Sequence, residues 1–235
     1  MLKAVIFDMD GVMIDSEPVH MEGNRMLMEH LGLEFNPEYY GQFIGSTTGY
    51  MWNKMIHDFS LQQSPDELMA LSDEFVSKIL GEKGYPQNPG VGELIVRMKQ
   101  AGYKLAIASS SGMKRIEYVL SCMGLTEYMD GIVSGMLVEH PKPAPDTFLK
   151  AAEILQVQPD ECIVVEDSVN GMKAAKAAGM VCIGYENPST MQKFSQLFGR
   201  EMTADMSYAD YVVQGFEEMD AGDMEMIYCH AMHEP

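Results

Sequence analysis

The chain has 235 residues, 46% of them hydrophobic, and its 16 Lys and Arg against 35 Asp and Glu give a formal net charge of −19. This length is enough for one large domain or two moderate ones, each with an ample core. The acidic balance leaves no basic surface to neutralise rows of phosphates, which excludes nucleic acid and anionic membranes as partners. An anionic substrate would have to meet cations that the site supplies locally.

The cysteines and the apolar segments indicate the compartment. The four cysteines have no metal-ligand spacing and two lie within apolar runs, so we interpret them as buried, reduced thiols. No apolar stretch approaches the length of a membrane span, and the run that begins at residue 4 leaves no room for a signal peptide. We expect a cytoplasmic protein that acts as a monomer.

The first predicted element is a buried strand, Ala4–Phe7, which leads directly into Asp8-Met9-Asp10-Gly11. Successive residues of a strand point to opposite sides, so Asp8 and Asp10 should face the same way. Two carboxylates this close repel each other unless a divalent cation or a shared proton relieves them. Taken alone, the pair fits a plain acidic turn equally well.

Residues 16–87 have helical spacing and contain no convincing strand. Ser16 is a predicted N-cap, and Gly32 ends the first helix. Ser64-Pro65-Asp66-Glu67 is a predicted capping box with proline at the first helical position. We therefore predict an all-helical domain over 16–87, joined to the remainder by two hinge crossings.

From residue 88 onward, strands alternate with helices. The predicted strands cover residues 104–108, 131–134, 162–165, 181–185 and 211–213. This alternation is typical of parallel sheets with right-handed crossovers, so the fold class is α/β, a doubly wound Rossmann-like core formed by 1–15 and 88–220. We assign no role to the acidic, Met-rich segment 221–235.

Parallel sheets bind ligands at the carboxyl ends of their strands, and polar residues follow several of the predicted strands here. Ser109-Ser110-Ser111 precede a helix, where hydroxyls and free N–H groups can bind phosphate or simply cap the helix. Three prolines flank Lys142 and fix its backbone, which favours a placed cation over a plain loop. Glu166 and Asp167 form a second acidic pair, and converging carboxylates predict bound Mg²⁺.

Four of these segments, DMDGV, ASSS, HPKPAP and VVEDS, are similar in order and spacing to the motifs of the haloacid dehalogenase superfamily of phosphohydrolases. The helical insert resembles the small cap of that superfamily, and its β-phosphoglucomutase and sugar-phosphatase branch is the most similar subgroup. The resemblance covers the chain to about residue 217, and joint occurrence of the four motifs by chance is very improbable.

The resemblance implies a role for each motif residue. Asp8 would be the nucleophile that becomes an aspartyl-phosphate, and Asp10 the general acid and then the general base. Lys142 and Ser109, with Ser110 beside it, would hold the transferring phosphoryl group.

The same resemblance implies a Mg²⁺ cofactor. Asp8, the backbone carbonyl of Asp10 and Asp167 would be its ligands, with Glu166 adjacent. In the helical insert, His20 matches a position where the resembled mutases also carry histidine, so it would contact the substrate or Asp10, with an exposed histidine at the helix start as the alternative. Thr48 lies in the cap loop that should face the substrate, where the mutases carry an arginine.

One departure bears on the reaction. The resembled mutases hold a second phosphate with an arginine of the cap loop, and no arginine occurs between Arg25 and Arg97. We therefore expect a phosphatase acting on a small phosphorylated metabolite, a sugar phosphate, with a β-phosphoglucomutase-type enzyme as the alternative. A haloacid dehalogenase, a phosphorylation-switched signalling domain or a noncatalytic binding protein would not need Asp10 together with the other motifs.

Overall fold

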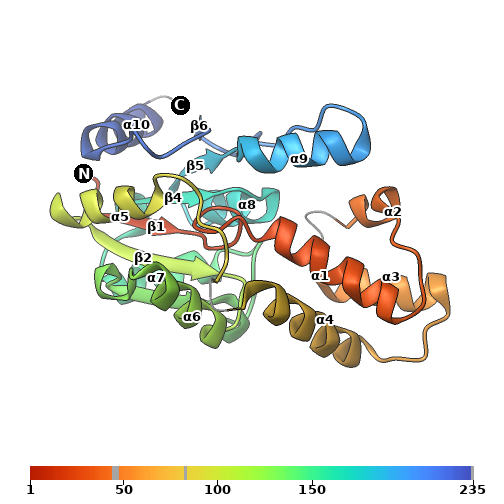
Figure 1. The fold of residues 1–235 in the computed structure, drawn as a ribbon. Coiled ribbons are helices and arrows are strands. Elements are labelled where there is room, and N and C mark those ends of the chain that lie inside the picture. Colours follow the sequence, from red (N-terminus) through yellow and green to blue (C-terminus); the bar gives the residue numbers. More distant parts are fainter. Residues whose placement is uncertain (44–47, 82–83, 234–235) are drawn as a thin grey trace. The chain divides into compact units, whose positions relative to one another are not determined.

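The computed structural model describes residues 1–43, 48–81 and 84–233, with Thr48 described by its backbone alone. The chain forms two compact units (Figure 1). We call residues 1–15, 86–191 and 203–235 the core unit, and residues 16–85 with 192–202 the helical unit.

The core unit is built on a six-stranded parallel sheet of order β3-β2-β1-β4-β5-β6. Its strands are β1 (Ala4–Phe7), β2 (Lys104–Ser109), β3 (Gly131–Ser134), β4 (Cys162–Glu166), β5 (Val181–Tyr185) and β6 (Tyr211–Val213). The sheet reverses its winding direction between β1 and β4, which is the doubly wound arrangement. The predicted fold class is confirmed.

Strand β1 lies at the centre of the sheet, where both faces are covered, and this explains its uninterrupted apolar sequence. All four of its residues are buried. Phe7 pairs with Ile107 of β2 on one side and with Val165 of β4 on the other. The N–H of Asp8 then donates to the Val165 carbonyl at 2.9 Å, so Asp8 is held between the ends of the two neighbouring strands.

Helices cover both faces of the sheet (Figure 1). They are α5 (Val91–Gln100), α6 (Met113–Met123), α7 (Asp146–Leu155), α8 (Val169–Ala177) and α10 (Ala221–His233). Helix α9 (Pro188–Phe198) follows β5, and most of its residues belong to the helical unit. One face carries small and branched side chains such as Ala4, Ile6 and Ala106, which pack with Phe148 of α7 and Met172 of α8. Helices α5 and α10 lie on the other side, and each buries an apolar stripe.

The C-terminal segment, to which the sequence assigned no role, forms helix α10 and is anchored to the core unit. The Tyr228 hydroxyl donates to the Asp160 carbonyl at 2.7 Å, and the Tyr103 hydroxyl donates to Glu225 at 3.1 Å. Met224, Ile227 and Tyr228 are buried. Helix α10 therefore belongs to the core of this unit.

The helical unit contains α1 (Glu17–His30), α2 (Pro37–Gly41), α3 (Thr48–Phe59) and α4 (Pro65–Leu80). Trp52 lies in its apolar cluster, which includes Leu27, Phe43 and Leu68. The predicted capping box at the start of α4 is confirmed, with both the Ser64 and the Glu67 side chains bonded. The predicted cap at Ser16 is wrong in its chemistry, because that residue has a helical backbone and makes no side-chain capping bond.

The sequence placed residues 192–202 in the core, and the structure groups them with the helical unit instead. The physical reason is a close contact between Gly41 of α2 and Phe198 of α9. A Cβ atom added at Gly41 would lie 2.7 Å from the Phe198 ring, so the absence of a side chain at Gly41 permits this close approach. The predicted boundary at residue 87 falls at 85 in the structure.

The two crossings between the units are paired with each other inside the core unit. The N–H of Asp15 donates to the Pro86 carbonyl at 2.8 Å, and the N–H of Asn88 donates to the Met13 carbonyl at 3.0 Å. The buried Asn88 side chain donates to the carbonyls of Gly11 and Val12 at 2.7 and 2.9 Å. These bonds fix the loop that follows Asp10.

No helix within residues 1–43, 48–81 and 84–233 is long and apolar enough to cross a membrane.

Candidate active site

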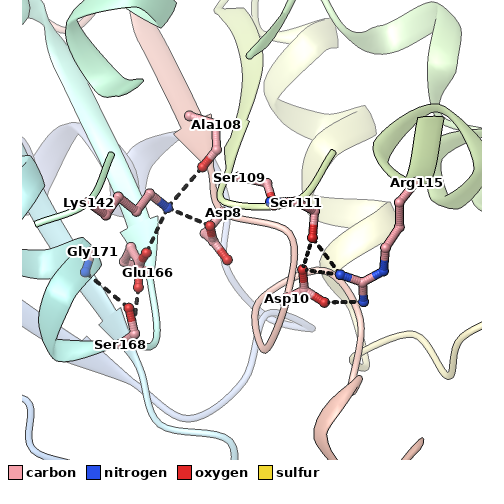
Figure 2. Close-up of polar contacts among 10 residues, drawn as sticks. All are labelled: Asp8, Asp10, Ala108, Ser109, Ser111, Arg115, Lys142, Glu166, Ser168 and Gly171. Atoms are coloured by element: carbon pink, nitrogen blue, oxygen red, sulfur yellow. Dashed lines mark hydrogen bonds and ion pairs between the residues drawn. The ribbon is translucent and has the colours of Figure 1, made fainter. Parts of the chain in front are cut away.

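The sheet brings three of the predicted motifs to one edge. Asp8 follows β1, Ser109 ends β2 and Glu166 ends β4, and these strands are neighbours in the order β2-β1-β4. All three side chains are buried, with 6%, 1% and 1% of their residues' surface exposed. The carboxyl ends of the central strands therefore form one polar cluster, drawn in Figure 2.

Lys142 lies at the centre of this cluster, although it comes from the loop before α7. Its ammonium donates to Asp8 Oδ1 at 2.5 Å, to Glu166 Oε1 at 2.9 Å and to the Ala108 carbonyl at 2.9 Å. It also lies 4.6 Å from the centre of the Phe148 ring. The side chain is only 5% exposed, so these three acceptors and the aromatic ring stabilise the buried ammonium in place of water.

Burial and charge shift the acid–base properties of this cluster. Burial raises the pKa of Asp8 to about 7, although the ammonium of Lys142 opposes the shift. Burial would lower the pKa of Lys142, but the charges of Asp8 and Glu166 outweigh it and raise that pKa above its ordinary value. We therefore assign a permanent positive charge to Lys142.

Asp167 lies against the loop that carries the first carboxylate pair. A Cβ atom added at Gly11 would be 1.8 Å from Asp167 Oδ2, and the φ angle of Gly11 is +83°. Glycine is therefore required at position 11 both for its backbone and for the room that the carboxylate occupies. Burial, followed by the charges of Glu166 and Asp8, raises the pKa of Asp167 well above its ordinary value.

Glu166 is fixed from the side of helix α8. Its Oε2 accepts from the N–H of Ser168 at 2.6 Å, and the Ser168 hydroxyl caps the helix by accepting from the N–H of Gly171 at 3.0 Å. A Cβ atom at Gly171 would lie 1.6 Å from Glu166 Oε1. The start of α8 therefore leaves a recess that the Glu166 carboxylate fills.

The serine loop after β2 is ordered by its own hydrogen bonds. Ser109 Oγ accepts from the N–H of Ser111 at 3.0 Å, and Ser134 Oγ donates to the Ser111 carbonyl at 2.7 Å. Ser110 is exposed. Gly112, rather than a serine, is the N-cap residue of α6, and it makes no side-chain cap. The plain capping interpretation of these serines is therefore wrong.

Two predicted substrate residues belong to the helical unit and remain predictions. The His20 ring lies 5.9 Å from the Tyr85 ring within that unit. Thr48 begins α3, and its side chain is outside the described residues.

The candidates named from the sequence did not include Arg115, which contacts Asp10 directly. Its Nη2 donates to Asp10 Oδ1 at 2.6 Å and its Nη1 to Asp10 Oδ2 at 2.8 Å, while Ser111 Oγ donates to the same Oδ2 at 2.8 Å (Figure 2). Arg115 is in the first turn of α6, four residues after Ser111. Ser111 precedes the helix, and no sequence signal joined Arg115 to Asp10.

A divalent cation fits the charge of the cluster. Four carboxylates (Asp8, Asp10, Glu166 and Asp167) accompany two cations (Lys142 and Arg115), which leaves two formal negative charges when all are ionised. The raised pKa values of Asp8 and Asp167 mean that protons supply part of that compensation in the metal-free chain. Within the described ranges, no three His, Cys, Asp or Glu side chains already converge as a preformed metal site. The fit therefore rests on charge and on hard oxygen donors.

A protein-family model of the haloacid dehalogenase-like hydrolases matches residues 2–179. The chain belongs to this family. The fructose-1-phosphate phosphatase YqaB of Escherichia coli strain K12 is 35% identical over 176 residues, which cover 75% of this chain and 92% of that protein.

Two further matches agree with this assignment to the haloacid dehalogenase-like hydrolases. A phosphorylated carbohydrates phosphatase of Thermotoga maritima is 31% identical over 179 residues, covering 76% of this chain and 82% of that protein. The crystal structure of a putative β-phosphoglucomutase, also from Thermotoga maritima, superimposes with a TM-score of 0.75 at 27% identity and covers 95% of this chain and 99% of its own. The chain is thus an enzyme of this hydrolase family, and the two sequence relatives described above are named as phosphatases.

Proposed function

We propose that this enzyme is a Mg²⁺-dependent phosphatase that hydrolyses a small phosphorylated carbohydrate through an aspartyl-phosphate on Asp8. The observation that carries the proposal is the buried triad of Asp8, Lys142 and Glu166, joined by contacts of 2.5 and 2.9 Å at the carboxyl ends of neighbouring strands. A carboxylate held by a permanent cation beside a loop rich in hydroxyl and N–H donors suits attack on a phosphate monoester.

In the first half of the reaction, a carboxylate oxygen of Asp8 forms a bond to phosphorus while the bond from phosphorus to the sugar oxygen breaks. Asp10 donates its proton to the departing oxygen, so that no free alkoxide is expelled. General acids of this kind typically contribute about 10²–10⁴-fold in rate. Lys142 faces the oxygens on which negative charge is redistributed, and Ser109 and Ser110 lie in the loop that would hold the phosphoryl group.

In the second half, water attacks the phosphorus of the aspartyl-phosphate and the bond to Asp8 breaks. Asp10, now a carboxylate, takes the proton from that water, which restores both residues and releases inorganic phosphate. Splitting one slow hydrolysis into two displacements is the general advantage of a covalent nucleophile.

Asp8, the backbone carbonyl of Asp10 and Asp167 would hold Mg²⁺, with Glu166 beside them. The cation, when bound, supplies positive charge against the transferring phosphoryl group and lowers the repulsion between the phosphate and the acidic cluster. Its hardness and its preference for carboxylate oxygens match the chemistry of these side chains. We further propose a cytoplasmic monomer, and the free thiols of Cys162 and Cys182 are consistent with a reducing compartment.

A mutase is the second candidate, favoured by the likeness to the putative β-phosphoglucomutase of Thermotoga maritima. It would use the same phosphoenzyme but pass the phosphoryl group to a second sugar hydroxyl. The lack of any arginine between Arg25 and Arg97 favours water as the acceptor, because a mutase must also bind a second phosphate.

The test is to incubate the enzyme and Mg²⁺ with fructose 1-phosphate, and separately with β-glucose 1-phosphate plus a bisphosphate primer. We expect release of inorganic phosphate to exceed formation of glucose 6-phosphate. Sustained isomerisation in excess of phosphate release would refute the phosphatase. The Asp10→Asn variant should fold normally and lose at least about 100-fold in turnover, because it can neither give nor take the proton. Substantial turnover by that variant would contradict the assigned role of Asp10.

A further inference from the structure

The carboxylate of Asp10 is held in place by residues at the start of α6. Both guanidinium Nη atoms of Arg115 donate to it, one to each oxygen, at 2.6 and 2.8 Å. Ser111 Oγ adds a third hydrogen bond at 2.8 Å, and Arg115 Nη1 is itself 2.5 Å from that hydroxyl oxygen. Figure 2 shows Asp10 turned toward Arg115, on the side of the loop away from Lys142.

This arrangement opposes proton transfer by Asp10, because three of the roughly four acceptor positions of its carboxylate are occupied and the guanidinium favours the ionised form. Both of its oxygens accept from donors, and a guanidinium has no lone pair with which to accept a proton in return. A general acid must carry a proton on one oxygen and direct it at the leaving group, and a general base needs a free lone pair directed at water. Opening of the contact with Arg115 would therefore free a carboxylate oxygen of Asp10 for the proton that each half-reaction requires.

The two carboxylates of the loop differ in how firmly they are held. The side chains of Asp8 and Lys142 are 8% and 5% exposed, so the ammonium has no alternative partner in water. The side chains of Asp10 and Arg115 are 30% and 28% exposed, so solvent can replace this pair at little cost. The first contact is a permanent part of the site, whereas the second can be released.

We propose that Arg115, assisted by Ser111, is a positioning residue that holds Asp10 in a resting position, and that release of this contact precedes proton transfer. The inference rests on the proposed function, because it assigns Asp10 the proton transfers. Partly exposed ion pairs of this kind shift an equilibrium by up to about five-fold, so the resting position should slow the step that needs the acid by about three- to five-fold.

The experiment compares Arg115→Met, Arg115→Lys and Lys114→Met in pre-steady-state phosphoryl transfer with Mg²⁺. Lys114→Met is the matched control. It removes one positive charge at an exposed side chain next to Arg115 in the sequence. With fructose 1-phosphate, Arg115→Met should transfer about three- to five-fold faster than the wild type. Arg115→Lys should give most of the same gain, because an ammonium cannot form the two-pronged contact. Lys114→Met should match the wild type.

A second substrate separates this role from a general effect of charge. The leaving group of 4-nitrophenyl phosphate needs little protonation, so its first-turnover burst should be unchanged in Arg115→Met. Equal acceleration with both substrates, acceleration by Lys114→Met, or a slower or unchanged Arg115→Met enzyme with fructose 1-phosphate would each overturn the inference.

A measurement without turnover tests the contact between Arg115 and Asp10 separately from the proposed function. In a double-mutant cycle of Asp10→Asn and Arg115→Met, followed by denaturant unfolding of the metal-free protein, the two residues should be coupled by about three- to five-fold in the folding equilibrium. A coupling of zero would mean that Arg115 does not hold Asp10, even if the enzyme is an active phosphatase. A wild-type enzyme that releases no phosphate, with the coupling present, would contradict the proposed function alone.

Discussion

Replacing Gly171 with alanine should destabilise the enzyme, although alanine is the better helix former. Gly171 lies in the first turn of α8, and a Cβ atom there would be 1.6 Å from Glu166 Oε1 and 1.9 Å from its Cδ. The Glu166 carboxylate cannot move aside, because it is 1% exposed and accepts hydrogen bonds from Lys142 and Ser168. The new methyl group must therefore displace the carboxylate from one or both partners.

The magnitude follows from two opposing terms. The change from glycine to alanine in a helix contributes about 1 kcal/mol of stability. Loss of one partner from a buried ion pair typically costs about 3–5 kcal/mol. The net expectation is a loss of roughly 2–4 kcal/mol in the free energy of unfolding, which for a chain of this size lowers the midpoint by roughly 5–15 °C.

The matched control is Gly92→Ala in the first turn of α5, where no heavy atom lies within 4 Å of the added Cβ. This variant should equal the wild type or gain up to about 1 kcal/mol. Thermal unfolding of the three proteins, followed by circular dichroism in one buffer, makes the comparison. If Gly171→Ala unfolded at or above the wild-type temperature, the packing of Glu166 against α8 would be refuted.

Two further predictions concern charge and the C-terminal helix. Because the folded-state pKa of Asp8 is raised from 3.8 to about 7, the native state binds protons more tightly, and the stability of metal-free protein should fall as pH rises across that interval. Mg²⁺ should therefore raise the unfolding temperature more at pH 8 than at pH 5, and an equal effect at both values would count against the site. Tyr228→Phe loses the hydrogen bond to the Asp160 carbonyl and should lower the free energy of unfolding by about 1 kcal/mol, measured in denaturant. Tyr211→Phe on the exposed edge strand should leave the free energy of unfolding unchanged. Equal losses in the two variants would contradict the anchoring of α10 by Tyr228.

Much of the fold could be predicted because its signals are local. Buried runs such as Ala4–Phe7 and Val181–Tyr185 are strands in the structure with the predicted ends, since a strand covered on both faces must be apolar throughout. The capping box at Ser64 is local in the same way. By contrast, residues 192–202 join the helical unit through a contact of Phe198 with Gly41, far away in sequence, and no short pattern reports such a contact.

In the candidate site, too, residues with local sequence signals were predicted, whereas a contact between residues distant in the chain was not. Asp8 and Glu166 were named from their carboxylates at the ends of predicted strands and Lys142 from the prolines that flank it, and the structure brings these three side chains into contact. Arg115 was missed because an arginine in the first turn of a helix is ordinary. Its partner Asp10 lies 105 residues away in the chain, so only the fold reveals their contact.

The paired crossings at Asp15–Pro86 and Met13–Asn88 have a consequence for how this architecture can vary. Backbone hydrogen bonds within the core unit join the segment before residue 16 to the segment after residue 85. Residues 16–85 are therefore an insertion whose two ends are held together by the core unit itself. Replacing 70 residues by a turn of about five would change the loop-closure term by only about 2 kcal/mol in favour of the core. Residues 16–85 can therefore vary in length and sequence while the sheet that carries the candidate site residues keeps its pairing, apart from the contact of Phe198 with Gly41.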